Sequence, residues 1–141
     1  MELSYQIVSL VETEFKFNYD YKYNEMINES LSFSFNHSIK VNETNDTLLL
    51  FMNVFVEDEN EIELAKQGIR GEFKVTPLKE FAQLNGDKIT VSNKNIMNTF
   101  LNVLIGALRG LLIGNLKNTP LNAIVLPLIP IAVIEKNTII K

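Results

Sequence analysis

The stretch from Asn95 to Ile134 constrains the fold most, because it is almost free of charge and falls into two parts. Only Arg109 and Lys117 interrupt it with a charge. The first part, residues 96–116, carries glycines at a four-residue spacing: Gly106, Gly110 and Gly114. This spacing lines the glycines along one side of an α-helix, where another backbone can approach closely. We therefore predict a long apolar helix whose glycine side is an oligomer interface.

The second part of the stretch contains three prolines, which cannot continue that helix. They are Pro120, Pro127 and Pro130. A membrane span needs about 20 predominantly apolar residues, but Arg109 lies in the middle of the helix, and prolines disfavour a helix exposed to lipid. We expect an extended apolar tail and no integral membrane segment. A sheet, a second subunit or a client polypeptide must then cover this apolar surface.

Length and composition indicate one globular domain spanning residues 1–141, with 46% hydrophobic and 21% charged residues. The chain has no cysteine, which excludes disulfides and thiolate metal sites. The first residues lack the pattern of a signal peptide, so we expect a cytoplasmic protein. Its pI near 5.0 argues against a nucleic-acid partner.

The charge is unevenly distributed along the chain. Residues 1–63 carry 13 acidic and 3 basic residues, whereas residues 64–141 carry 4 acidic and 10 basic residues. This asymmetry fits either two halves packed together or an acidic face offered to a basic partner.

The first half of the chain is predicted to form four strands. Apolar and polar residues alternate with a period of two over residues 15–23 and again over 31–41. Residues 47–56 are apolar on both faces, which is typical of a central strand. Residues 62–75 form the fourth strand, with Gly68 and Gly71 as expected bulges. The short turns between these segments predict an antiparallel meander.

The second half is predicted to be mainly helical. Thr76 and Pro77 form a helix start, with Thr76 as the N-cap, and Asn85-Gly86 ends this short helix. One face of it would carry Leu78, Phe81, Ala82 and Leu84. Residues 89–91 are extended, and Ser92 or Asn93 caps the long helix. The expected fold class is α+β: a four-stranded antiparallel β-sheet, a short helix, a long apolar helix and the tail that contains prolines.

The sequence offers no convincing catalytic set, and we predict that the protein is not an enzyme and needs no cofactor or metal. His37, the only histidine, is in phase with the apolar face of its strand and is expected to be packed there. An acidic cluster precedes the fourth strand, but it lacks the glycine and terminal glutamate of a calcium loop. We interpret it as a solvated hairpin tip that binds a basic partner; its residues are Glu57, Asp58, Glu59, Glu61 and Glu63.

Glu63–Val75, Ala107–Leu112 and the pair Asn118–Leu121 and Leu126–Ile129 are three segments that together resemble the SecB-type protein-export chaperones. Glu63–Val75 resembles the last strand of that family, with glycines ahead of a phenylalanine, and Ala107–Leu112 resembles its main helix. Asn118–Leu121 followed by Leu126–Ile129 resembles its Gly-Thr-Pro and Leu-Pro-Pro-Ile-Asn pattern. Here Asn118 replaces the glycine, Leu128 the second proline and Pro130 the asparagine. The order of elements over residues 29–134 matches the family better than residue identity does.

The resemblance implies an ATP-independent holdase that binds unfolded preproteins in apolar grooves. It also implies a homotetramer or homodimer and delivery of clients to the SecA motor. The family's groove lies where the main helix and the connection before it meet the sheet edge. Here that region offers the expected peptide-binding residues, with Phe81 and Phe100 as aromatic anchors: Leu78, Phe81, Leu84, Ile89, Ile96, Phe100 and Leu104. Each of these could instead belong to the core. The alternative function is an interaction or regulatory protein with one dedicated partner, for example in a toxin–antitoxin system.

Overall fold

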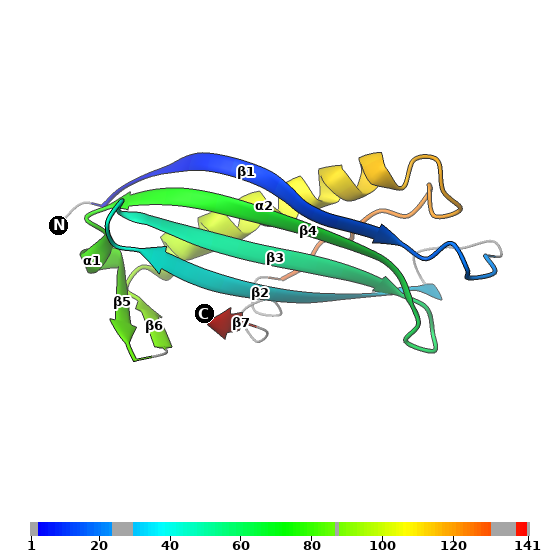
Figure 1. Cartoon of the computed structure of the whole chain (residues 1–141), viewed down its shortest axis with the longest axis horizontal. Helices are drawn as coiled ribbons and strands as arrows, with labels where there is room; N and C mark the ends of the chain where they lie inside the picture. Colours follow the sequence, from blue (N-terminus) through cyan, green and yellow to red (C-terminus); the bar gives the residue numbers. More distant parts are fainter. Residues whose placement is uncertain (1–2, 24–29, 87, 131–137, 141) are drawn as a thin grey trace.

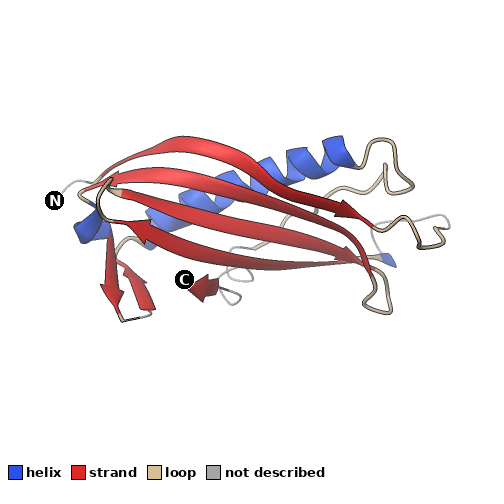
Figure 2. Ribbon diagram, viewed as in Figure 1, coloured by secondary structure: helices blue, strands red, loops and turns tan. Residues whose placement is uncertain are grey.

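The computed structural model describes residues 3–23, 30–86, 88–130 and 138–140. It is a sheet with one long helix on one face (Figures 1 and 2). The elements in chain order are β1 (Ser4–Phe17), β2 (Ser32–Asn42), β3 (Thr47–Glu57), β4 (Glu63–Thr76), α1 (Leu78–Phe81), β5 (Ala82–Asn85), β6 (Lys88–Val91), α2 (Lys94–Asn115) and β7 (Thr138–Ile140). The predicted α+β class, with a four-stranded antiparallel sheet followed by a short and a long helix, is confirmed.

The strand order is β1-β4-β3-β2-β7, with β5 and β6 forming a separate hairpin. Strands β2, β3 and β4 follow one another as the predicted meander, but β1 needs a correction because it pairs with β4 rather than with β2. The chain therefore crosses the width of the sheet between β1 and β2. Strands β3 and β4 take the centre, as the apolar character of residues 47–56 indicates, and β1 lies at an edge.

The first strand also lies earlier in the chain than its alternation predicts, because β1 ends at Phe17. The aromatic residues at the end of β1 and in the turn after it pack on one another. The Phe17 ring stacks on Tyr23 with 5.3 Å between ring centroids, and Tyr21 meets Tyr23 edge-on at 4.9 Å. The Tyr23 hydroxyl donates to the Asn18 carbonyl at 2.6 Å. A compact aromatic turn thus produces the same alternation that a strand would.

The core lies between α2 and the inner face of the sheet. Alternate residues of β3 from Leu48 to Val56 are fully buried there, as are Phe73 of β4 and Leu104 of α2. The Phe73 ring stacks on Phe100 of α2 at 4.1 Å between centroids. Of the two predicted caps of α2, Asn93 is the one used, its Oδ1 accepting from the Ile96 N–H at 3.1 Å.

A polar network joins this core to β1. Gln67 is fully buried on the inner face of β4, and its Nε2 donates to Glu12 of β1 at 2.9 Å. Asn115, in the last turn of α2, donates to Gln67 Oε1 at 2.7 Å and to Glu12 at 2.6 Å. Buried polar groups need such partners, so the network helps to fix the register of β1 and the position of the helix end.

Residues 116–130 leave α2 as a tail that begins with turns at residues 116–123, where the sequence predicted an extended segment, and they contribute Leu121, Ile124 and Leu126 to the core. Arg109 of α2 holds this segment: its Nε donates to the Leu126 carbonyl at 2.9 Å and its Nη2 to the Pro127 carbonyl at 2.8 Å. The charged side chain in the middle of the apolar helix therefore supplies hydrogen bonds to two carbonyls of the tail, which lies outside any sheet or helix.

The connection between β4 and α2 differs from the predicted single helix. Pro77, not Thr76, is the N-cap of α1, which ends after one turn at Phe81. Ala82 and Leu84 then belong to β5, and Gly86, at φ +68°, forms the turn to β6. The long helix α2 ends at Asn115, one residue before the end of the predicted range 96–116.

The expected bulges are shifted to the neighbouring strand. The irregularities of the β1–β4 register fall at Val8 and Thr13 of β1, whereas the β3–β4 register passes Gly68 and Gly71 without a break. The two glycines instead provide space. A Cβ on Gly68 would clash with Thr13 and lie 2.5 Å from Asn53 Oδ1.

Gly71 allows α2 to approach the sheet, and its substitution should destabilise the fold. A Cβ on Gly71 would lie 2.6 Å from Phe73 Cε2 and 2.8 Å from Leu104 Cδ2. We expect Gly71→Ala to lower the free energy of unfolding by about 1–3 kcal/mol, the usual cost of overpacking a core. Urea unfolding measures it. In a Leu104→Ala background the additional loss should be smaller, since one clash is removed; equal losses in both backgrounds would contradict this account.

Candidate functional site

The most apolar opening lies where β2, β6 and the start of α2 meet. It is a cleft of about 380 Å³. Its apolar lining comes from Ile39 of β2, Ile89 and Val91 of β6, and Met97 and Leu101 of α2. His37, Thr90, Lys94 and Asn98 add polar groups to the wall. A cleft lined by apolar side chains with a few polar ones suits an extended apolar ligand.

The structure divides the seven expected peptide-binding residues. Five are buried in the core, including both proposed aromatic anchors: Leu78, Phe81, Ile96, Phe100 and Leu104. Phe81 is fully buried and meets Phe100 edge-on at 6.0 Å. A substitution of either ring would therefore remove core volume. Leu84 is 48% exposed, and Ile89 lines the cleft. The cleft thus lies in the expected region but is built largely from other residues.

Sequence reasoning missed the cleft residues Ile39, Val91, Met97 and Leu101. Ile39 and Val91 lie in segments that the sequence predicts as extended, and an alternating pattern does not distinguish a core side chain from one that lines a cleft. Met97 and Leu101 lie on the predicted helix, but its hydrophobic pattern does not separate the side that meets the sheet from the side that meets the β5–β6 hairpin. Only the placement of that hairpin creates the opening.

Strand β1 presents a second apolar surface that the sequence did not reveal. It is 14 residues long and forms the free edge of the sheet in the described part of the chain. Four of its aliphatic side chains are 41–50% exposed: Ile7, Val8, Leu10 and Val11. A long edge strand with exposed apolar side chains is a template for pairing with another chain.

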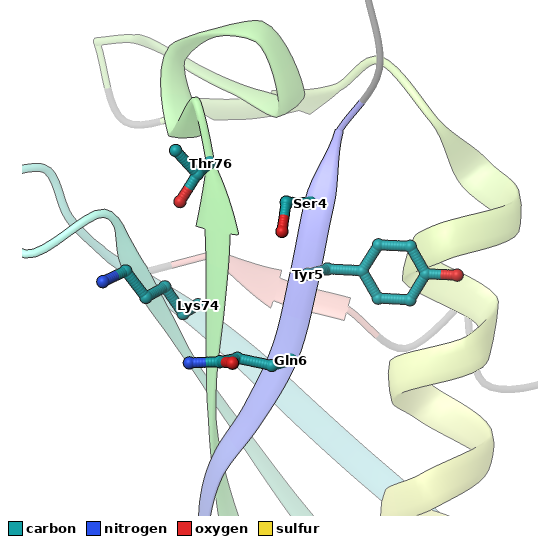
Figure 3. Close-up of a pocket in the computed structure, with 5 residues that line it drawn as sticks. All are labelled: Ser4, Tyr5, Gln6, Lys74 and Thr76. Carbon is teal, nitrogen blue, oxygen red and sulfur yellow. The ribbon is translucent and has the colours of Figure 1, made fainter.

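A second pocket, of about 300 Å³, lies where β1 begins and β4 ends (Figure 3). Ser4, Gln6, Lys74 and Thr76 line it together with Tyr5. Figure 3 shows that the Tyr5 ring extends toward α2, whereas Gln6 and Lys74 lie together on the other side of β1. Its polar groups do not converge on a common point, so it has little to offer a ligand.

In the acidic hairpin between β3 and β4, one carboxylate accepts hydrogen bonds within the turn itself. Asp58 is only 7% exposed. Its Oδ1 accepts from the backbone N–H groups of Ile62 at 2.9 Å and Asn60 at 2.8 Å, and its Oδ2 accepts from the Tyr21 hydroxyl at 2.8 Å. The Ile62 N–H, followed by the Tyr21 hydroxyl, lowers the pKa of Asp58.

The other acidic residues of the hairpin remain accessible to a partner. Glu59, Glu61 and Glu63 are exposed, and the half-buried Glu57 accepts from Ser34 at 2.8 Å. The outer face of the sheet is mixed in charge. By register it carries the acidic residues Glu14, Glu57 and Glu72, and the basic residues Lys16, Lys40, Lys66, Arg70 and Lys74. The excess of acidic over basic residues in the hairpin therefore does not extend over this face.

The three glycines of α2 lie on its outer side. Gly106, Gly110 and Gly114 are exposed, and a Cβ added to any of them would meet no atom within 4 Å. The exposed Ile113 lies beside them. This small-residue surface is thus available to a second chain.

By length and composition α2 could also cross a membrane. It is the one such helix in the described ranges, but the side opposite its glycines packs on the sheet.

The role of Asp58 predicts a pH-dependent stability. Because its folded pKa lies below the usual 3.8, its contribution is present above pH 3.8 and is lost as the pH falls through the folded pKa. We expect Asp58→Ala to be less stable than the wild type at pH 7, with the difference shrinking below pH 3.8. Urea unfolding at several pH values measures both. Glu59→Ala, at the exposed neighbour, is the control and should change little. A difference that stays constant with pH would contradict this role.

Comparison with known proteins assigns this chain to no family. No family model, no curated protein and no solved structure matches it. Among the residues that the structure describes, no three His, Cys, Asp or Glu side chains are grouped so that they could hold a metal ion. The candidate site is therefore the apolar cleft between β2, β6 and α2.

Proposed function

We propose that this protein is an ATP-independent holdase that binds unfolded polypeptides at the cleft between β2, β6 and α2. The observation that carries the proposal is the cleft itself, an apolar opening of about 380 Å³ at a sheet edge. Leu84, which is 48% exposed, pairs across the β5–β6 hairpin with the cleft residue Ile89. Such a site selects for apolar, extended chain rather than for one chemical group.

Burial of apolar surface can drive this binding without a nucleotide. Each Å² of apolar surface removed from water contributes about 25 cal/mol, and the cost of ordering a flexible chain opposes it. The net affinity is then moderate and only weakly dependent on the client sequence, which suits a protein that holds and releases many clients.

The resemblance to SecB-type chaperones supports the proposal through the order of elements. A four-stranded antiparallel sheet is followed by a connection, a long helix and an irregular tail held by Arg109. We propose cytoplasmic action on preproteins. We propose the SecA motor as the recipient of these clients, reached through the exposed acids of the β3–β4 hairpin.

The second candidate is a binding protein with one dedicated partner. Its support is the small size of the cleft, which would hold only a short segment. The two candidates differ in breadth: a holdase suppresses the aggregation of two unrelated unfolded proteins without a nucleotide, whereas a dedicated binder suppresses neither.

Ile89 offers a direct test of the cleft. We expect Ile89→Lys to weaken binding of an unfolded client at least about tenfold, since a charge would enter the apolar wall. Fluorescence anisotropy with a labelled, permanently unfolded client measures the affinity. The matched control is Ile62→Lys, because Ile62 is also apolar and 44% exposed but lies in the β3–β4 turn. Equal affinities of the two variants would exclude the cleft.

We also propose that the protein is a homodimer or homotetramer, held in part by the glycine side of α2. Gly110→Leu should place a bulky side chain on that side and lower the mass that light scattering measures at micromolar concentration. Gln83→Leu adds the same side chain to an exposed position of β5 and is the control. A monomeric wild type, or an unchanged mass for Gly110→Leu, would contradict this assembly, and the free β1 edge would then be the next surface to test.

A further inference from the structure

The two edges of the sheet differ in one respect that bears on the cleft. Within the described residues, the outer edge of β1 has no strand partner, whereas β2 pairs with β7, a three-residue strand far from it in the sequence. The pairing is parallel and joins His37 to Thr138, Ser38 to Ile139 and Ile39 to Ile140. The β2 edge is therefore able to accept an added strand, and the chain itself supplies one (Figure 1).

The edge and the cleft share residues. His37 and Ile39 pair with β7 through their backbones, and both also line the cleft. A segment added to β2 would thus gain main-chain hydrogen bonds from the strand and apolar contacts from β6 and α2. Strand addition of this kind derives affinity from the backbone and selectivity from pockets for alternate side chains.

The pairing of β7 is short enough to be exchanged. It covers three of the eleven residues of β2, and the remainder of this edge has no strand partner in the described ranges. Parallel pairs are also slightly less stable per residue than antiparallel ones. The sequence Thr-Ile-Ile is rich in β-branched residues, which favour strands. A longer segment of similar character would pair with more of β2.

We propose that the β2 edge is a strand-acceptor site for extended, uncharged apolar segments of client polypeptides, and that β7 occupies it within the chain until a client displaces it. This inference rests on the proposed function and adds to it the mode of binding and a competitor built into the chain. Client affinity is then set by the difference between client pairing and β7 pairing.

A reversible crosslink tests the exchange in the full-length chain. The chain has no cysteine, so the only disulfide that the variant Ser38→Cys/Ile139→Cys can form within one chain joins the two paired positions. Oxidation would lock β7 onto β2, and reduction would release it. The single variant Ser38→Cys, given the same treatments, controls for the redox conditions. Failure of the intramolecular disulfide to form, or formation between two chains instead, would overturn the pairing of β7 with its own β2.

Two labelled probes separate this inference from the holdase proposal. The first is a synthetic peptide of residues 135–141, and the second is an unfolded client without cysteines. We expect both to bind at least tenfold more weakly to the oxidised form than to the reduced one. Peptide binding that is equal in the two forms would overturn the acceptor site. Client binding that is equal while peptide binding falls would overturn the displacement of β7 by clients but leave the holdase intact. A client that binds neither form, with the peptide still excluded by oxidation, would refute the holdase and leave the acceptor site standing.

Discussion

The packing of α2 on the inner face of the sheet is the contact on which the rest of the structure depends. Phe73 and Phe100 stack at its centre, and Gly71 lets the helix come close enough for Leu104 to reach the strand. In the described part of the chain, α2 packs on one face of the sheet and no helix covers the other face (Figure 1). The cleft lies at the border of this contact, and the glycine side of α2 faces away from it.

The edges of the contact explain why the cleft exists. The chain leaves β4 through one helical turn and the β5–β6 hairpin before it enters α2. The hairpin stands beside β2 and leaves an apolar opening between them, lined by Ile89 and Met97. A straight helix at residues 78–85, as the sequence suggested, would have placed these apolar groups elsewhere. The proposed client site is therefore a product of the connection and is not a property of the helix alone.

The charged and aromatic residues show how one pattern can serve two structures. The alternation at residues 15–23 belongs partly to β1 and partly to an aromatic turn in which Tyr21 donates to Asp58. The acidic hairpin likewise combines exposed carboxylates with one that accepts hydrogen bonds inside the turn. Sequence alone cannot separate these roles, because both a solvated acid and a capping acid are favourable in a turn.

Local sequence determined the elements that depend on neighbouring residues: a cap at Ser92 or Asn93, the long apolar helix, the end of that helix before the prolines, and strands close to residues 31–41, 47–56 and 62–75. These follow from periodicity and capping, which act over a few residues. Tertiary structure alone decided that β1 pairs with β4, that Phe81 and Phe100 lie in the core while Ile89 lines a cleft, and that β7 returns to β2. A periodic pattern identifies the apolar side of an element but not the element that will cover it, because that choice depends on contacts between residues far apart in the chain.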